Sequence, residues 1–508
     1  MNAAQHDSPP IDSVQALLAE TGMHARSLRE VLALLAAAPR SLDDLIRLTA
    51  VPRRSVEEIL SAAGGDVESG DGTYRLRPEA APRYRARFAL DALEQPPATP
   101  PGALEQVREF IESGPAPLAA LDHVTATAES VLRRAEWMRD HYDLDGARVL
   151  FVGDHDLTSL AVGLVCPSAS VTVVDLDERV LAHIDRVAAE HGLAIRTLHT
   201  DLRFGLPPQL EADLVFTDPP YTPEGIGLFA TRAAECVAGP QSRVLIAYGF
   251  SPRSPALGHK VQQELLRLGM VFEAILPDFH RYHGAQAIGS ASDLYVCQPT
   301  AHTRKLALRQ AVGIYTHGPQ SVEARETSAP EEFLHAIGDR IGAMVSTLRY
   351  PGWSRPVQLK LSAPVFDLRA DPGPWLLRML LACNTERLGL VVDNNHPDIT
   401  SETAQRELSE LVGPKYKLRF HRSTPDPKHA IVIADEVEES SSRGYLLRRA
   451  HGKVGNTWRE ALISVSDSLT KREAKELVAE RAPVAGDLDL RLIDLPRHRL
   501  RTLLRVVD

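Results

Sequence analysis

Short apolar runs alternate with longer segments between residues 148 and 247, and this alternation restricts the fold more than any other feature. The runs are rich in Val, Leu and Ile, and they span residues 148–152, 170–175, 195–199, 213–217 and 243–247. The intervals are long enough for helices, for example at 178–190. Strands that are joined by helices pair in parallel, and their crossovers are right-handed. The pattern therefore predicts an α/β domain built on a doubly wound sheet.

Regions of different character flank this central domain, which we place at residues 91–305. Residues 1–24 are polar and contain prolines, which predicts a flexible lead-in. Residues 25–90 contain three short helical patterns, with Ser41 placed to cap the second helix. A hairpin pattern with a glycine-flanked tip follows at 67–76. Three helices and a hairpin predict a winged helix-turn-helix.

The segment 306–508 shows a second alternation of strands and helices. The expected strands are 357–361, 388–393, 416–421 and 430–435, and the expected helical stretches are 330–350 and 400–411. We find no repeat that relates this segment to the central domain. The sequence thus predicts a C-terminal α/β domain, to which it assigns no chemistry.

The composition narrows the class of protein and its location. The 508-residue chain carries a formal net charge of −10, which argues against a large nucleic-acid footprint and suits cationic ligands. The four cysteines have no CxxC spacing, so we expect reduced thiols and neither disulfides nor a bound metal. The chain has no signal-like start and no apolar run of about 18 residues, which predicts a cytoplasmic protein without membrane contact.

An acidic turn with two prolines follows the fourth apolar run. Residues 218–221 read Asp-Pro-Pro-Tyr. Consecutive prolines hold φ at about −65° and remove two backbone donors, so neither a helix nor a central strand continues through them. Asp218 and Tyr221 are therefore expected on a stiff turn at the carboxyl end of a strand, where ligands bind in open α/β sheets. The carboxylate, the carbonyl of Pro219 and the aromatic ring can together receive a substrate amine.

The turn after the first apolar run is acidic, whereas nucleotide-binding domains usually have glycines there. Residues 153–158 read Gly-Asp-His-Asp-Leu-Thr, so Asp154 and Asp156 follow a single glycine. In methyltransferases the α-carboxylate of S-adenosylmethionine lies near this turn. At about 4 Å and an effective dielectric of about 20, each carboxylate pair would repel by on the order of 4 kcal/mol. Decarboxylated S-adenosylmethionine ends in an ammonium group instead, and the same residues would attract it.

Two further acidic residues stand where the second and third apolar runs end. Asp175 lies about 20 residues after the first turn, where an acidic side chain accepts both ribose hydroxyls of a nucleotide. Asp201 is placed to meet the adenine amino group, and a capping role explains it nearly as well. Together with Gly153 and Asp154, these residues form the predicted cofactor site.

Four segments together resemble the branched-chain polyamine synthase family, the N4-bis(aminopropyl)spermidine synthases. They are residues 153–157, 201–203, 218–225 and 292–295. The winged-helix start and the Asp-His-Val-Thr-Ala-Thr segment at 122–127 fit the same resemblance. The resemblance implies a Rossmann-like sheet of the class I methyltransferase type, followed by no domain equivalent to 306–508.

The resemblance also implies an activity, namely transfer of aminopropyl groups from decarboxylated S-adenosylmethionine to a spermidine-like nitrogen. Methylthioadenosine would be released, without a metal, by an enzyme expected to be a homodimer. The implied catalytic residues are Asp156, Asp154 and Asp218, with Asp156 or Asp154 accepting the amine proton. The residues expected to contact the polyamine are Asp218, Pro219, Tyr221, Glu224 and Asp293, with Asp278 as a further candidate.

One residue of the acidic turn departs from the family pattern. The family has Gly-Asp-Asp-Asp, and His155 stands here in place of the middle aspartate. The substitution removes one negative charge and introduces an imidazole, which can itself act as a base. The choice of proton acceptor and of acceptor amine therefore stays open.

Two alternatives belong to other functional classes. Asp-Pro-Pro-Tyr is also the motif of adenine-N6 DNA methyltransferases, in which the turn holds the amine of a flipped base. A polyamine-sensing regulator would instead bind DNA through Arg53 and Arg54 of the winged helix. The neighbouring Glu57 and Glu58 favour packing or dimerisation as the role of that helix.

Overall fold

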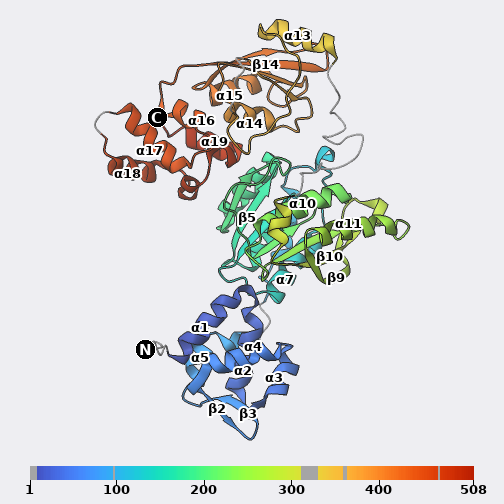
Figure 1. Cartoon of the computed structure of the whole chain (residues 1–508), viewed down its shortest axis with the longest axis vertical. Helices are drawn as coiled ribbons and strands as arrows, with labels where there is room; N and C mark the ends of the chain where they lie inside the picture. Colours follow the sequence, from blue (N-terminus) through green and yellow to red (C-terminus); the bar gives the residue numbers. More distant parts are fainter. Residues whose placement is uncertain (1–8, 95–97, 310–329, 358–362, 467–468) are drawn as a thin grey trace.

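The protein consists of three lobes stacked along its long axis (Figure 1). The computed structural model describes residues 9–94, 98–309, 330–357, 363–466 and 469–508. The N-terminal lobe lies at one end, the central sheet lies in the middle, and the C-terminal lobe lies at the other end. Among the helices in these ranges, none has the length and apolar character needed to cross a membrane.

The central lobe contains a seven-stranded mixed sheet with the order β6-β5-β4-β7-β8-β10-β9. The five parallel strands are β4 (Arg148–Val152), β5 (Ser170–Asp175), β6 (Ile195–His199), β7 (Leu214–Thr217) and β8 (Arg243–Tyr248). The antiparallel strands are β9 (Met270–Arg281) and β10 (Ala291–Pro299). The five strands expected from the apolar runs are therefore present, in the order of the methyltransferase fold.

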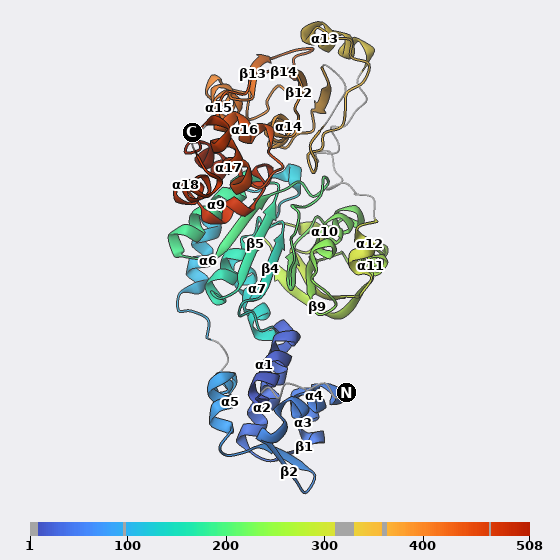
Figure 2. The ribbon, with the colours of Figure 1, turned by 60° about the vertical axis from the view of Figure 1, so that its left-hand side comes forward.

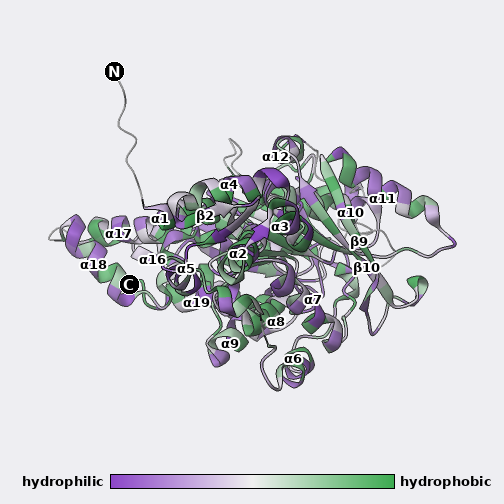
Figure 3. Ribbon diagram, turned by 90° about the horizontal axis from the view of Figure 1, so that it is seen from below, coloured by the Kyte–Doolittle hydropathy of each residue, from purple (hydrophilic) through white to green (hydrophobic). Residues whose placement is uncertain are grey.

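Helices cover both faces of this sheet and bury a separate core on each. They are α6 (Ala103–Glu112), α7 (Ala128–His141), α8 (Thr158–Val165), α9 (Glu178–His191), α10 (Pro223–Cys236), α11 (Pro255–Arg267) and α12 (Thr303–Ala307). Successive side chains of a strand point to opposite faces, so Phe151 and Val152 of β4 belong to different clusters. Helix α8 is buried against the sheet and is mainly green, the hydrophobic colour, in Figure 3.

The N-terminal lobe has helices and a small sheet of order β1-β3-β2. Its elements are α1 (Pro10–Thr21), α2 (Ala25–Ala37), β1 (Arg40–Ser41), α3 (Leu42–Thr49), α4 (Arg53–Ala63), β2 (Val67–Gly70), β3 (Thr73–Leu76) and α5 (Ala81–Arg87). Ser41 caps α3 as expected, because its hydroxyl accepts the N–H of Asp44 at 3.1 Å. The expectation of a flexible lead-in is wrong for residues 10–21. They form α1, whose Val14 and Leu18 are buried one helical turn apart.

The C-terminal lobe contains a four-stranded sheet with the order β11-β12-β14-β13. Its strands are β11 (Val365–Leu368), β12 (Arg387–Asp393), β13 (Tyr416–His421) and β14 (His429–Glu436). Its helices are α13 (Glu331–Ile341), α14 (Trp375–Ala382), α15 (Glu402–Val412), α16 (Ser442–Arg448), α17 (Val454–Val465), α18 (Lys471–Arg481) and α19 (Arg497–Leu504). Three expected strands and the helix at 400–411 are confirmed. The helix expected over 330–350 ends at Ile341, and the strand expected at 357–361 lies outside the described residues after Val357.

The C-terminal lobe packs against the central sheet at the β5–β6 side. In Figure 2 the C-terminal helices lie beside α9 and the edge of the sheet. Nε2 of His498 in α19 lies within hydrogen-bonding distance of Asp185 in α9, at 2.8 Å. A single hydrophobic cluster contains Leu176 and Leu202 from the central lobe and Trp375 and Leu376 from α14. The two lobes therefore share a core.

Candidate active site

The candidate site lies at the carboxyl ends of β4, β5 and β7, where ligands bind in sheets of this type. The turn after β4 begins at Gly153, whose φ is 72°. A Cβ atom at this position would lie 3.0 Å from the Phe229 ring. Both the positive φ and this close approach require glycine. The turn after β7 places Asp218 and Tyr221 opposite it.

Two of the predicted cofactor carboxylates lie next to each other and are buried. Asp154 accepts the N–H groups of Thr158 at 2.9 Å and of Ser159 at 3.1 Å, at the start of α8. Asp175 accepts the N–H groups of Asp154 and Asp177, both at 2.8 Å. Burial raises the pKa of Asp154 to about 8 and that of Asp175 to about 6. The carboxylate of Asp154 therefore faces the backbone of α8.

Replacing Asp154 with asparagine should change the pH dependence of stability. Because burial raises its pKa from 3.8 to about 8, the folded state binds this proton more tightly than the unfolded chain. The contribution of Asp154 to the free energy of unfolding is therefore greatest below pH 3.8, the pKa in the unfolded chain. It decreases as the pH rises towards about 8, the pKa in the folded protein. Asparagine keeps an oxygen for the α8 backbone and does not ionise. The variant should therefore gain unfolding free energy relative to wild type between about pH 5 and 8, by up to about 1.4 kcal/mol per pH unit.

Urea denaturation of both proteins across this pH range measures that difference. A constant or falling difference would show that Asp154 is ionised in the folded protein throughout.

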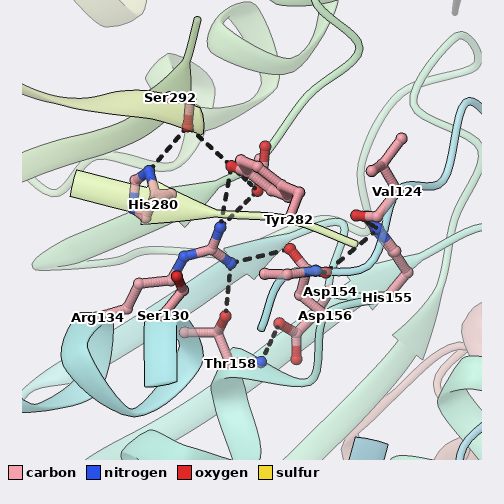
Figure 4. Close-up of polar contacts among 12 residues, drawn as sticks. Val124, Ser130, Arg134, Asp154, His155, Asp156, Thr158, His280, Tyr282 and Ser292 are labelled. Carbon is pink, nitrogen blue, oxygen red and sulfur yellow. Dashed lines mark hydrogen bonds and ion pairs between the residues drawn. The ribbon is translucent and has the colours of Figure 1, made fainter. Parts of the chain in front are cut away.

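A buried arginine joins the two acidic turns. Arg134 of α7 donates to Asp156 at 2.9 Å (Figure 4). It donates to Asp218 at 2.6 Å as well, and its side chain is 0% exposed. It also donates to Thr158 at 3.1 Å and to Tyr282 at 3.2 Å. The nearby carboxylates hold the pKa of Arg134 above its ordinary value, although burial alone would lower it. One guanidinium therefore neutralises part of the charge of two carboxylates.

Tyrosine and serine hydroxyls complete the surroundings of Asp218. Tyr221 donates to Asp218 at 3.0 Å, and Tyr282 donates to it at 2.8 Å. Ser292 lies 2.9 Å from Tyr282 and 2.9 Å from Nδ1 of His280 (Figure 4). Burial raises the pKa of Asp218 to about 6, although Arg134 opposes that shift. We call the residues Arg134, Asp156, Thr158, Asp218, Tyr221 and Tyr282 the Arg134 cluster.

Asp156 is held more strongly in its ionised form. Its side chain accepts the N–H of Ala126 at 2.7 Å in addition to its ion pair with Arg134. Burial would raise the pKa of Asp156, but the charges of His155 and Arg134 bring it below the ordinary value. Asp156 and Asp218 therefore differ in basicity although one guanidinium contacts both.

His155, the residue of the acidic turn that differs from the family pattern, forms a pair with another histidine. The rings of His155 and His123 stack with their centroids 4.4 Å apart. Nε2 of His155 lies 2.8 Å from the carbonyl oxygen of Val124 and 3.4 Å from Asp156. Burial opposes protonation of His155, but the charge of Asp156 raises the pKa of His155 above its ordinary value. For His123, burial and the neighbouring His155 hold the pKa well below the ordinary value. His155 is therefore the more basic member of the pair.

The remaining predicted substrate residues lie outside the Arg134 cluster. Pro219 is buried in the turn after β7, and Glu224 is exposed in the first turn of α10. Asp293 of β10 accepts the N–H of Asp278 at 2.9 Å. The structure therefore groups Asp156, Asp218 and Tyr221.

Asp201, the residue expected to meet adenine, is fully buried after β6. One carboxylate oxygen accepts the backbone N–H and the Nε–H of Arg203, both at 2.9 Å. The other oxygen accepts Nη2–H of Arg203 at 2.6 Å and Nε1–H of Trp375 at 2.9 Å. Asp201 is therefore hydrogen-bonded to the C-terminal lobe through the indole of Trp375 in α14.

Neither Arg134 nor Tyr282 is among the site residues expected from the sequence motifs. A signal for Arg134 exists, because it lies on the helix face that also carries Val131, Ala135 and Met138. An arginine on an apolar face is rarely buried unless it is paired with an acidic group. Tyr282 follows β9 in a stretch without such periodicity.

Within the ranges that the structure describes, His, Cys, Asp and Glu side chains form no cluster of three or more suited to holding a metal ion. All four cysteines are free and buried.

The central lobe matches a known family model and several curated proteins. The model described as "Branched-chain polyamine synthase A C-terminal domain" matches residues 102–302. An uncharacterized protein of Methanocaldococcus jannaschii, MJ0675, is 34% identical over 215 residues, which are 42% of this chain and 54% of that protein. The N(4)-bis(aminopropyl)spermidine synthase of Thermococcus kodakarensis is 32% identical over 185 residues, which are 35% of this chain and 52% of that enzyme.

Among solved structures, a mutein of the branched-chain polyamine synthase of Thermus thermophilus is 22% identical and has a TM-score of 0.38. It covers 61% of this chain and 96% of its own. That protein was crystallised with N4-aminopropylspermidine and 5'-methylthioadenosine. This chain spans between 52% and 64% of the length of the curated relatives that it matches. The family model and the curated matches therefore show that residues 102–302 are similar to the branched-chain polyamine synthase family.

Proposed function

We propose that the central lobe transfers an aminopropyl group from decarboxylated S-adenosylmethionine to a nitrogen of a spermidine-like polyamine. The observation that carries this proposal is the meeting of two acidic turns, with Asp156 and Asp218 joined by Arg134 at the carboxyl ends of β4 and β7. Arg134 offsets one negative charge, and Asp175 adds another beside the turn. A donor with a cationic tail suits this site, whereas a donor with an α-carboxylate would meet repulsion.

The reaction forms a bond between the acceptor nitrogen and the donor's methylene carbon next to sulfur. The carbon–sulfur bond breaks, and sulfur keeps the electron pair as the thioether of methylthioadenosine. The sulfonium carbon is already electrophilic, so the protein must align the amine in line and accept its proton. We assign alignment to Asp218, Pro219 and Tyr221, and donor binding to Gly153, Asp154 and Asp175.

Three carboxylates are candidates for the proton acceptor, namely Asp154, Asp156 and Asp218. A useful base has a pKa near the working pH. Asp156 is held below its ordinary pKa, and Asp154 is turned towards the α8 backbone. Asp218 has a pKa of about 6, and its side chain is 10% exposed against 3% for Asp156. We therefore rank Asp218 first and give Asp156 the role of holding the cationic amine.

The test compares two donors with the same full-length protein. With spermidine and decarboxylated S-adenosylmethionine, we expect methylthioadenosine and a spermidine derivative heavier by one aminopropyl group or two. With S-adenosylmethionine itself, we expect no adenosylhomocysteine above a no-enzyme control. Chromatography with mass detection measures all of these products. Methyl transfer from the carboxylated donor, without aminopropyl transfer, would overturn the proposal in favour of a methyltransferase.

For the N-terminal lobe, we propose a winged helix that serves packing and does not read DNA. Helix α4 would be its recognition helix. Arg53 pairs with Glu57 at 2.8 Å, and Arg54 pairs with Glu58 at 2.9 Å. These pairs offset the positive charge that phosphate contacts need.

A further inference from the structure

The C-terminal lobe reaches the part of the sheet where the proposed donor's nucleoside would lie. Trp375 of α14 donates to Asp201 after β6 at 2.9 Å. The backbone N–H of Arg497 donates to Glu178, at the start of α9, at 2.7 Å. Arg378 also forms an ion pair with Glu178. The lobe is therefore anchored on the segments that follow β5 and β6.

A cavity of about 210 Å³ lies at this contact. One wall is apolar and comes from the central lobe, with Leu118, Leu121 and Leu176. The opposite wall comes from the C-terminal lobe, with Pro374, Leu377 and Pro397. Charged residues also line the cavity, including Asp177 and Arg497. Both lobes are thus needed to enclose it.

The position and size of the cavity suit one ring system of the donor. Its residues Leu176 and Asp177 directly follow Asp175, the predicted ribose ligand, so a base beyond the ribose would enter there. Pockets for whole drug-sized ligands measure about 300–1,000 Å³, so a smaller space fits part of such a molecule. Two facing apolar walls favour a flat, weakly polar group such as a purine.

The hydrogen bonds of Asp201 leave its carboxylate without a free acceptor site for the adenine base. A carboxylate offers about four lone-pair sites. Three donors from Arg203 and one from Trp375 already occupy the two oxygens of Asp201. An adenine amino group would have to displace one of them. The carboxylate instead holds α14, and with it Leu377, in place.

We propose that the C-terminal lobe supplies the outer wall of the donor's adenine subsite, with Asp201 and Trp375 as positioning residues that hold this wall. This inference rests on the proposed function of the central lobe. The C-terminal lobe would then help to bind the nucleoside of the donor, whereas the acceptor amine would bind at the Arg134 cluster. The walls recognise the base by shape and apolar contact.

The experiment measures binding of methylthioadenosine to the full-length protein by calorimetry. Leu377→Trp places a larger side chain in the cavity, and Trp375→Phe removes the indole N–H but keeps a ring beside Phe204, whose centroid lies 5.5 Å away. We expect both variants to bind methylthioadenosine at least about 10-fold more weakly, equivalent to about 1.4 kcal/mol. We also expect a raised KM for the donor, with kcat and the KM for spermidine nearly unchanged.

The matched control is His498→Gln, which replaces the imidazole that contacts Asp185 at the same interface but outside the cavity lining. It should bind methylthioadenosine like wild type. Wild-type affinity in either of the two variants with intact folds would overturn the assignment of the wall and leave aminopropyl transfer standing. A wild-type protein that binds no methylthioadenosine and transfers no aminopropyl group would overturn both proposals. Binding without transfer, weakened in both variants, would support the wall and refute the reaction.

Discussion

Asp218→Asn should lower the turnover of aminopropyl transfer by about 10²- to 10⁴-fold, the usual contribution of a positioned acid or base. Asparagine preserves the shape, but its single oxygen can replace only one of the two carboxylate oxygens to which Tyr221 and Tyr282 separately donate. It cannot take a proton from the amine at neutral pH, and it cannot attract a cationic acceptor. Initial rates of methylthioadenosine release at saturating spermidine measure the effect.

The control for this prediction is Asp140→Asn, which removes an exposed carboxylate of α7, the helix that carries Arg134. Its turnover should equal that of wild type. Far-UV circular dichroism should be similar for wild type, Asp140→Asn and Asp218→Asn, which would show that all three proteins are folded. If Asp218→Asn retained near-normal turnover with an intact fold, the chemistry would have to occur elsewhere in the molecule.

Arg134→Met should be the most destabilising single change near the site. Arg134 is fully buried between Asp156 and Asp218, so its removal leaves two buried carboxylates without their cation. Breaking a buried ion pair by deleting one partner costs about 3–5 kcal/mol. We expect a loss of that size in the free energy of unfolding of the central lobe, measured by denaturation at pH 7.

A second variant separates charge from packing. Arg134→Met combined with Asp156→Asn removes one of the stranded charges, so it should recover part of the stability that Arg134→Met loses. Because the residues are in contact, the two effects should not add. Equal stability of wild type and Arg134→Met, or no recovery in the double variant, would show that the guanidinium contributes little net electrostatic stabilisation here.

Much of the central fold was predictable because its signals are local. Each strand from β4 to β8 is a short apolar run, and the intervals permit helices. The two prolines after Asp218 end the strand wherever the chain folds. Because ligands bind at the carboxyl ends of parallel strands, the turn at Asp218 was expected at the binding edge of the sheet.

The N-terminal lobe contains a helix that these local sequence signals did not predict. The polar residues and prolines of segment 1–24 predict a flexible lead-in, although Val14, Leu17 and Leu18 give residues 10–21 an apolar helical face. Helix α1 is ordered because Val14 and Leu18 belong to the hydrophobic core of the lobe. Secondary structure that depends on tertiary packing is weakly encoded in local propensity.

By itself, the sequence determined the doubly wound sheet and the presence of carboxylates at its binding edge. Only the tertiary structure decided what each carboxylate contacts. Arg134 reaches Asp218 across 84 residues, and Trp375 reaches Asp201 across 174. No local pattern specifies such pairs, because they form only when distant elements pack and their buried charges and polar groups must find partners.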